Sequence, residues 1–265
     1  MAIKNVAVIG LWQPRNPITQ ALLPAGFTVT AITRDSSTST FPADVQVRKA
    51  DLSSLESLTK AFAGQDAVIC TTATSEAGNQ NILADAAVAA GVKRFIPSEF
   101  GFNIRAGKIS HQTIEKLPYM VAKKEAVDHL EELAAENLGF TWTGLATNMW
   151  LDWALDQCLF PISPSARTTT IFDSGNSLIS TCTLSFIGQA VVAILQREQE
   201  TANEYLSIVQ FTITMNQLLK LFASELGMKE EDFTVTHVKS ADLEKNGHEK
   251  LAKGDYIGGI NVLMA

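Results

Sequence analysis

The chain has 265 residues, enough to bury a sizeable core in one large or two small domains. Apolar residues make up 46% and charged residues 18%, and the formal net charge of −7 argues against nucleic acid as a partner. No apolar run reaches the ~18 residues of a membrane-spanning helix, and the N-terminus leads straight into an apolar run, so we expect no signal peptide, no membrane contact and a cytoplasmic protein.

The first predicted element is a buried strand over residues 6–9, which ends at Gly10. Its sequence, VAVI, is the short apolar run that is typical of a parallel strand covered on both faces. Asn16 and Pro17 fit the N-cap and the first position of a following helix. A strand, a turn at a glycine and a helix are the opening of a dinucleotide-binding α/β fold.

The turn after Gly10 departs from the usual glycine-rich pattern. Further glycines would let the backbone approach a pyrophosphate closely, and they are missing from this turn. Trp12 and Gln13 put large side chains there, and the charge of Arg15 is the one compensating feature. We therefore assign Gly10, Trp12, Gln13 and Arg15 to the cofactor-binding turn, and we expect a dinucleotide to bind weakly or not at all.

Strand and helix signals alternate through the rest of the first half. This alternation predicts a Rossmann-type, doubly wound parallel sheet with right-handed crossovers, strand order 3-2-1-4-5-6 and helices on both faces. The further strands are expected at residues 27–33, 45–47, 67–71, 92–96 and 140–145, and the helices at 52–62, 79–90 and 123–136.

Near residue 150 the pattern changes to short strands and turns. We interpret residues 1–150 as a dinucleotide-binding domain and residues 151–265 as a smaller C-terminal α/β lobe that binds substrate. The strands of this lobe are expected at 168–172, 180–183, 207–213 and 233–238, its helices at 186–196 and 215–226, and a turn at 173–176.

Two polar residues follow the second and third predicted strands. An acidic residue at the position of Arg34 would bind a ribose 2′-hydroxyl, whereas an arginine pairs with a 2′-phosphate and favours NADPH. The alternative for Arg34 is a solvated loop residue. Asp51 can accept a hydrogen bond from an adenine amino group, or it can cap the next helix.

Further candidates stand at the ends of the fourth and fifth strands, where open α/β sheets bind ligands. Thr72 is small enough to let a ribose and nicotinamide approach, and Ser98 is expected beside them. Glu99 is a candidate acid or base, and its alternative role is to accept hydrogen bonds from backbone N–H groups. The carboxyl ends of these strands are therefore predicted to form the cofactor site.

Tyr119 and Lys123 stand four residues apart at the start of a predicted helix and hence on one face. A lysine beside a nicotinamide can bind its ribose, lower the pKa of a nearby phenol or donate a proton itself. Lys124 is expected to be a solvated lysine. We therefore take Lys123 and Tyr119, together with Glu99, as the candidate catalytic residues.

Phe100, Asn148 and Trp150 are candidates for the substrate pocket, because they follow the fifth and sixth strands. Aromatic side chains there suit a flat substrate, and their alternative role is packing between the lobes. The four histidines form no HExxH pair and the three cysteines have no metal-ligand spacing, so no metal site is expected.

Several blocks together resemble the NmrA-like, isoflavone-reductase-like branch of the atypical short-chain dehydrogenases, and most of all its fungal members. These blocks are VAVIG, FTVTAITR, DLSSLESLTKAF, AAGVKRFIPSEFG, the Tyr119–Lys123 helix, GFTWTGLATNMWLDWAL and FDSGN. The resemblance covers residues 3–240 and implies NADPH binding, with Arg34 on the 2′-phosphate. It also implies reduction of activated C=C bonds or benzylic positions, with Lys123 as the catalytic residue.

Three functions remain open at this point. The first is an NADPH-dependent reductase of a small aromatic or polyketide-like secondary metabolite. The second is a cofactor-independent isomerase, cyclase or dehydratase that reuses the pocket, with Lys123, Tyr119 or Glu99 as acid or base. The third is an NmrA-like regulator that senses a dinucleotide. The expected partner is a small molecule, and the chain is expected to be a monomer or a homodimer.

Overall fold

The apolar runs of the first half pair into one seven-stranded sheet in the computed structural model, and every neighbouring pair in this sheet is parallel. Its order is β11-β6-β5-β4-β1-β2-β3, which confirms the predicted order 3-2-1-4-5-6 and adds β11 beside β6. The bounds are β1 (Asn5–Ile9), β2 (Thr28–Thr33), β3 (Gln46–Lys49), β4 (Ala67–Cys70), β5 (Arg94–Ile96), β6 (Thr141–Ala146) and β11 (Glu204–Ser207).

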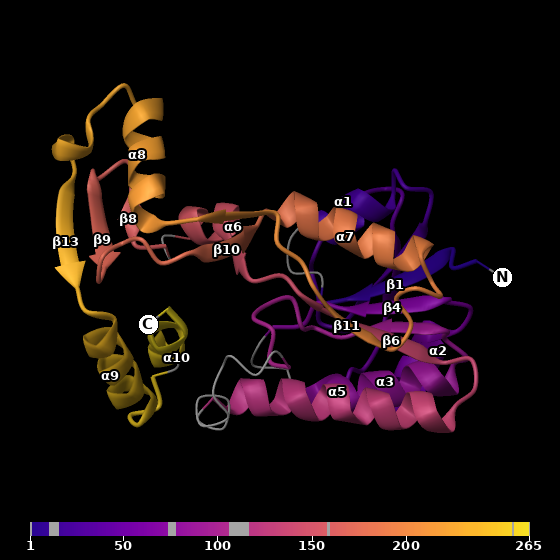
Figure 1. The fold of residues 1–265 in the computed structure, drawn as a ribbon. Coiled ribbons are helices and arrows are strands. Elements are labelled where there is room, and N and C mark those ends of the chain that lie inside the picture. Colours follow the sequence, from indigo (N-terminus) through magenta and orange to yellow (C-terminus); the bar gives the residue numbers. More distant parts are fainter. Residues whose placement is uncertain are drawn as a thin grey trace. The chain divides into compact units, whose positions relative to one another are not determined.

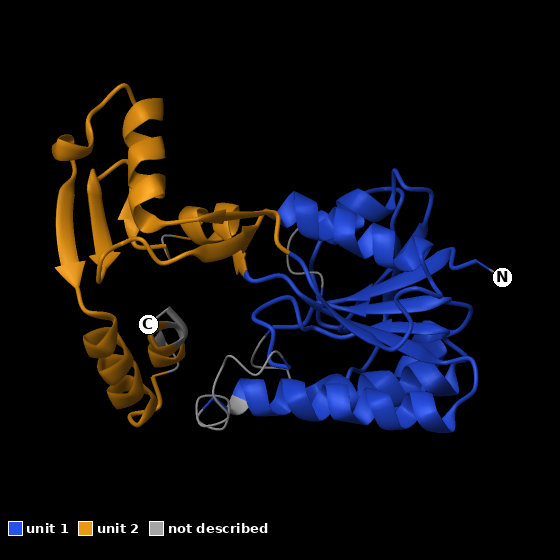
Figure 2. Cartoon of the chain, viewed as in Figure 1, with its two compact units in different colours: residues 1–148, 184–208 blue, residues 149–183, 209–265 orange. Residues whose placement is uncertain are grey.

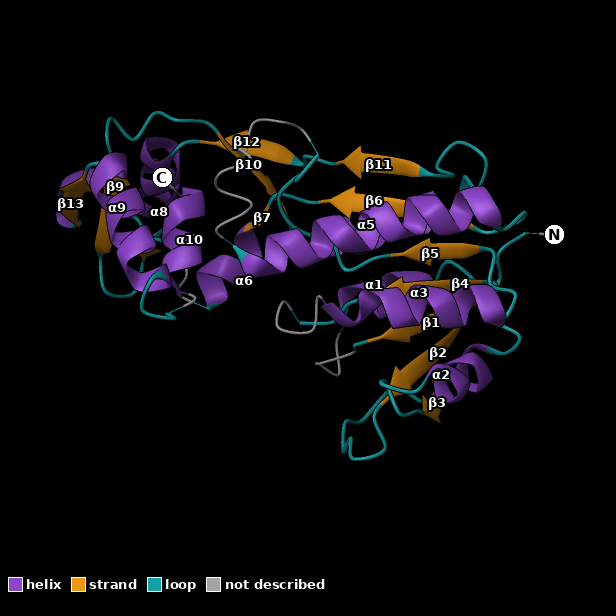
Figure 3. Ribbon diagram, turned by 90° about the horizontal axis from the view of Figure 1, so that it is seen from below, coloured by secondary structure: helices purple, strands orange, loops and turns teal. Residues whose placement is uncertain are grey.

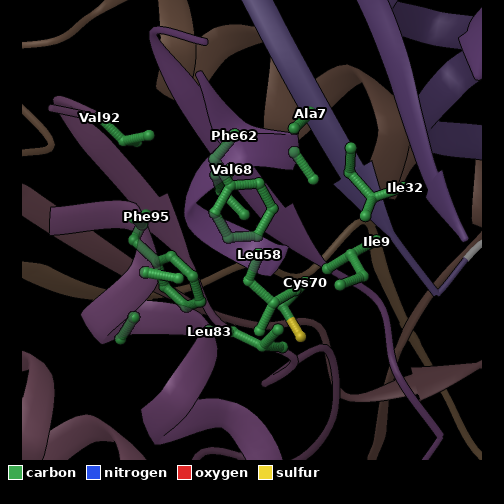
Figure 4. Packing of buried hydrophobic residues seen from close by; sticks show 14 of the residues in the cluster. Ala7, Ile9, Ile32, Leu58, Phe62, Val68, Cys70, Leu83, Val92 and Phe95 are labelled. Carbon is green, nitrogen blue, oxygen red and sulfur yellow. The ribbon is translucent and has the colours of Figure 1, made fainter. Parts of the chain in front are cut away.

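Helices cover both faces of this sheet, as expected for a doubly wound fold (Figures 1 and 3). One face carries α2, α3 and α5, and the other carries α1 and α7. Apolar side chains of the strands pack against α2 and α3 to form the core, among them Ile9, Val68 and Phe95 (Figure 4). The bounds are α1 (Pro17–Leu22), α2 (Leu55–Phe62), α3 (Gln80–Ala89), α5 (Pro118–Glu136) and α7 (Leu184–Gln196).

The chain divides into two compact units (Figure 2). Unit 1 comprises residues 1–148 and 184–208, and unit 2 comprises residues 149–183 and 209–265. This division differs from a single boundary near residue 150, because α7 and β11 return to unit 1. The structure describes residues 2–10, 16–73, 78–105, 117–157, 160–255 and 257–264.

Unit 2 holds two three-stranded sheets around a core of its own. The first is β12-β10-β7 and the second is β13-β9-β8. Two helices near its C-terminal end, α9 and α10, were not predicted from the sequence. The bounds are β7 (Met149–Trp150), α6 (Leu151–Asp156), β8 (Ile162–Ser163), β9 (Thr168–Phe172), β10 (Ile179–Cys182), β12 (Phe211–Ile213), α8 (Met215–Glu225), β13 (Thr234–Val238), α9 (Ser240–Leu251) and α10 (Ile257–Met264). Within the described residues, no helix has both the length and the apolar character needed to cross a membrane.

The prediction of one strand over 207–213 is wrong, because the segment contributes to two sheets in different units. The Ile208 N–H donates to the Ala146 carbonyl and so continues the pairing of β11 with β6. The Gln210 N–H donates to the Thr181 carbonyl, where the chain joins β10. The alternating pattern of the segment is the same in either sheet, so it could not reveal this change.

Gly188 determines how closely α7 approaches α1. A Cβ atom at this position would lie 2.5 Å from the Pro17 carbonyl oxygen and 2.9 Å from the Ala21 Cβ. Gly188→Ala is therefore expected to push the helices apart and to lower the free energy of unfolding by about 1–3 kcal/mol, as overpacking does. Urea unfolding followed by circular dichroism measures this change.

The matched control for this prediction is Gln189→Ala, one residue along α7, where the side chain is exposed. It is expected to leave the free energy of unfolding within about 0.5 kcal/mol of the wild type. Alanine has a higher helix propensity than glycine, by about 1 kcal/mol, so Gly188→Ala would stabilise α7 if there were no clash. A Gly188→Ala protein that is as stable as the wild type, or more stable, would therefore show that the two helices can move apart at little cost.

Candidate active site

The carboxyl ends of β1 and β4 meet at Gly10. The φ angle of Gly10 is +91°, and a Cβ there would lie 2.6 Å from the Thr71 carbonyl carbon and 2.7 Å from the Thr72 nitrogen. The Thr71 hydroxyl donates to the Ile9 carbonyl at 3.0 Å and so holds the ends of β4 and β1 together. Only glycine fits this approach, since its backbone adopts positive φ and carries no side chain.

The end of β5 is joined to the same place through Ser98. Its hydroxyl donates to the Thr72 carbonyl at 2.9 Å, and its N–H donates to the Gln80 Oε1 at 2.6 Å. Gln80 lies in the first turn of α3 with 1% of its surface exposed, and its buried Nε2 has no hydrogen-bond partner among the described residues. Gln80 was missed in the sequence, where it is one polar residue in an alanine-rich helix.

Lys123 reaches this cluster from α5. Its Nζ donates to the main-chain carbonyl of Glu99 at 2.9 Å, and the side chain is half-buried. Burial lowers the pKa of the Lys123 ammonium, and the negative charge of Glu99 partly opposes that change. Lys124 is exposed and pairs with Asp128 at 2.6 Å, as expected for a lysine rotated about 100° around the helix.

The Glu99 carboxyl group is enclosed, with 1% of the residue exposed. Its Oε2 accepts a 2.6 Å hydrogen bond from the hydroxyl of Tyr205 on β11, and its buried Oε1 has no partner within the described part of the chain. Burial raises the pKa of Glu99, and the charge of Lys123 partly offsets this. Tyr205 was missed in the sequence, because it lies just before the strand predicted over 207–213, which was assigned to the second lobe.

Tyr119 lies one helical turn before Lys123 on α5. Burial raises the pKa of its phenol to about 12, so the side chain is neutral near pH 7. Of the roles open to Lys123, lowering the pKa of this phenol finds no support, because burial shifts that pKa upward.

The three substrate candidates do not share one environment. Phe100 is buried, with 8% of its surface exposed. Asn148 has a φ angle of +57°, and its Nδ2 donates to the Ile208 carbonyl at 2.9 Å. Trp150 belongs to unit 2 and contacts Trp153 edge-to-face with ring centroids 5.6 Å apart. Contact with substrate stays a prediction for all three.

Arg34 and Asp51 lie after β2 and β3. The side chain of Arg34 is exposed directly after its strand. The Asp51 Oδ1 accepts from the Ser53 N–H at 2.9 Å and from its hydroxyl at 2.7 Å. The helix-capping alternative for Asp51 is wrong, because Ser54 is the N-cap of α2 and accepts from the N–H of Ser57.

Trp12, Gln13 and Arg15, which were assigned to the cofactor-binding turn between β1 and α1, lie outside the described residues. Asn16 caps α1 as predicted, since its Oδ1 accepts from the N–H groups of Ile18 at 2.9 Å and Thr19 at 3.2 Å.

Pro17 has no N–H, and Gln20 donates its own to the Asn16 carbonyl. The amides that usually bind a pyrophosphate at this helix are therefore occupied within the chain. Gly10 and Arg34 fit a dinucleotide, whereas the first turn of α1 offers it no free donor.

The sequence model of the NmrA-like family matches residues 13–253. The chain belongs to the NmrA-like family. Among its relatives, the oxidoreductase poxI of Penicillium oxalicum is 36% identical over 242 residues, which cover 90% of this chain and 74% of the relative. The oxidoreductase aprR of Aspergillus flavus is 36% identical over 241 residues, covering 90% and 77%. The isoflavone reductase homolog IRL of Zea mays is 24% identical and covers 82% and 72%.

Solved structures share the fold of this chain. AtPrR2 with NADP+ and (+)pinoresinol superposes with a TM-score of 0.78 at 18% identity, covering 98% of this chain and 86% of that one. The complex of leucoanthocyanidin reductase from Vitis vinifera with NADPH superposes with a TM-score of 0.79 at 18% identity, covering 98% and 84%. These matches confirm the Rossmann-type fold expected from the alternating strands and helices.

Proposed function

We propose that this chain is an NADPH-dependent reductase of a small aromatic or polyketide-like molecule. The observation that carries the proposal is the placement of Lys123, whose half-buried ammonium group is held by the Glu99 carbonyl at the end of β5. Ser98 and Thr72 connect that end to β4, which abuts Gly10. The fungal relatives named oxidoreductase, and the NADP+ and NADPH bound in two solved structures of the same fold, support it.

Bound NADPH would supply a hydride to an activated C=C bond or to a benzylic or carbonyl carbon. Gly10 would allow the tight turn after β1 that lies beside the cofactor, and Arg34 would pair with the 2′-phosphate. Lys123 would hold a proton at Nζ and deliver it to the substrate atom on which negative charge develops. A lysine with a lowered pKa gives up this proton more readily than a solvated one.

Titration with NADPH and NADH tests the cofactor. NADPH is expected to bind weakly and NADH more weakly still, and a dissociation constant for NADPH on the order of micromolar would support the reductase. Arg34→Asp is expected to weaken NADPH binding by about 10–150-fold, because a hydrogen bond to a charged group contributes about 1.5–3 kcal/mol. NADH binding should be kept or become tighter, since NADH has no 2′-phosphate and the new carboxylate can accept a hydrogen bond from its ribose 2′-hydroxyl. Isothermal titration calorimetry measures both nucleotides.

Arg197→Gln is the matched control, because this arginine is 67% exposed and its side chain pairs with Glu200 at 3.9 Å on the surface. It should bind both nucleotides as the wild type does. Equal losses of NADPH and NADH affinity in Arg34→Asp would remove the 2′-phosphate role from Arg34. No binding of either nucleotide at millimolar concentration would eliminate the reductase.

One observation favours a second candidate function, a cofactor-independent isomerase, cyclase or dehydratase. The first-turn amides of α1 are taken by Asn16 instead of being free for a pyrophosphate. Such an enzyme would use Lys123 and Glu99 as acid and base in the same pocket. The titration separates the two candidates, because only the reductase needs the nucleotide.

A further inference from the structure

The ring of Tyr205 lies against a glycine on the neighbouring strand. Tyr205 on β11 is directly opposite Gly144 on β6. A Cβ at Gly144 would lie 2.5 Å from Cδ2 and 2.9 Å from Cε2 of the tyrosine ring. Because Gly144 has no side chain, the Tyr205 ring can extend across β6 toward β5, the next strand of the sheet. The edge strand thereby brings a phenol to the candidate site.

The hydroxyl of this ring meets the residue that holds Lys123. Tyr205 donates to the Glu99 Oε2 at 2.6 Å, and the two residues are 106 positions apart in the chain. The main-chain carbonyl of Glu99 accepts from the Lys123 Nζ at 2.9 Å. A buried carboxylate needs hydrogen-bond donors to stay in place. The Tyr205 hydroxyl donates to one of its two oxygens, and the other has no partner among the described residues.

We propose that Tyr205 is a positioning residue for Lys123: its hydroxyl holds Glu99, and Glu99 holds the ammonium group at its carbonyl. The inference rests on the proposed function, in which Lys123 delivers a proton. Tyr205 acts through Glu99 and makes no contact of its own with the reacting atoms. Loss of the hydroxyl is expected to alter both the orientation of the Glu99 carbonyl and the charge of its carboxyl group.

The charged and titratable groups around this pair determine the sign of the effect. Lys123 from α5, Tyr205 from β11 and Arg105 from the segment after β5 act on Glu99, and Cys70 from β4 acts on Lys123. Burial raises the pKa of Tyr205, so the phenol stays protonated and donates. This donation favours the carboxylate of Glu99, and the carboxylate in turn favours the protonated form of Lys123. Without the hydroxyl, Lys123 should lose its proton at lower pH.

Tyr205→Phe tests the inference, because it keeps the ring beside Gly144 and removes only the hydroxyl. The full chain is labelled with acetic anhydride at a series of pH values from about 7 to 11, and mass spectrometry compares Lys123 with the exposed Lys124. The pH at which Lys123 labelling reaches half its full rate, its midpoint, is expected to fall. At pH values below that midpoint, the rate for Lys123 relative to Lys124 should then be about tenfold higher than in the wild type. Glu204→Gln, an exposed residue on the same strand, should leave the midpoint unchanged.

A purely structural role for Tyr205 would speed the labelling of Lys123 at every pH without moving its midpoint. That result, or an unchanged curve, would overturn the inference. If Tyr205→Phe does not fold, Glu99→Gln takes its place, because it keeps an acceptor for the Tyr205 hydroxyl and removes the negative charge. It is expected to lower the same midpoint, and an unchanged midpoint would overturn the inference equally.

The labelling needs neither nucleotide nor substrate, so its outcome is independent of the proposed function. A shifted midpoint in a chain that does not bind NADPH would contradict the reductase function and still support the coupling of Tyr205 to Lys123. NADPH binding together with an unshifted midpoint would support the reductase function and contradict the positioning role of Tyr205. Once a substrate is found, Tyr205→Phe is expected to lower kcat about tenfold and to leave the dissociation constant of NADPH unchanged.

Discussion

Lys123→Ala is expected to abolish turnover, with a loss of about 10²–10⁴-fold in kcat. The reason is positional, since the Lys123 Nζ is half-buried at the carboxyl end of β5 and is held there by the Glu99 carbonyl. Tyr119 is expected to be a poorer proton donor than Lys123, because burial raises the pKa of that phenol to about 12. NADPH oxidation in the presence of a panel of phenolic enones measures the rate.

Lys124→Ala is the matched control for this prediction. It removes the same charge one residue further along α5, where the side chain is exposed and bound to Asp128. It should keep nearly all activity and lose at most ~1 kcal/mol of stability, because a surface ion pair contributes little. Equal turnover in Lys123→Ala and the wild type would exclude Lys123 from the mechanism and leave Tyr119 and Glu99 as candidates.

Arg94→Ala is expected to cost about 3–5 kcal/mol of unfolding free energy, the largest loss of stability among these variants. Arg94 is 2% exposed. Its Nε donates to the Thr141 hydroxyl at 2.8 Å, and its Nη1 donates to the hydroxyls of Thr143 at 2.8 Å and Thr201 at 2.9 Å. Its Nη2 donates to the Glu198 carbonyl at 2.6 Å. Alanine would remove all of these donors and leave a cavity.

Lys93→Ala is the control, since this neighbouring cation is 40% exposed and pairs with Asp66 at 2.7 Å. It should cost no more than ~1 kcal/mol. Arg94→Lys should recover only part of the loss, because an ammonium group cannot reproduce the fork of a guanidinium. Urea unfolding measures all three variants. A cost for Arg94→Ala as small as that for Lys93→Ala would show that water replaces the guanidinium.

Arg94 also links stability to the candidate site. It begins β5, the strand that leads to Ser98 and Glu99, and it bonds to the turn that precedes β11. Tyr205 follows that turn by a few residues. The hydrogen bonds of Arg94 therefore join β5, which leads to Glu99, to β6 and to the turn that leads to Tyr205.

The local features of this chain were determined by the sequence alone. The apolar run over residues 6–9 specifies a buried parallel strand, because such a strand has no solvent face. Asn16 and Pro17 specify the start of α1, because a cap forms within one turn. The placement of Lys123 inward and Lys124 outward follows from helical rotation and needed no knowledge of distant residues.

Other features were decided only by the tertiary structure. Residues 184–208 belong to unit 1, and the segment 207–213 is divided between two sheets. The partner of Glu99 is Tyr205, and Gly144 makes room for that contact. Each of these features depends on residues far apart in the chain or on a choice between two sheets. Periodicity describes which face of an element is buried, and it does not specify what that face packs against.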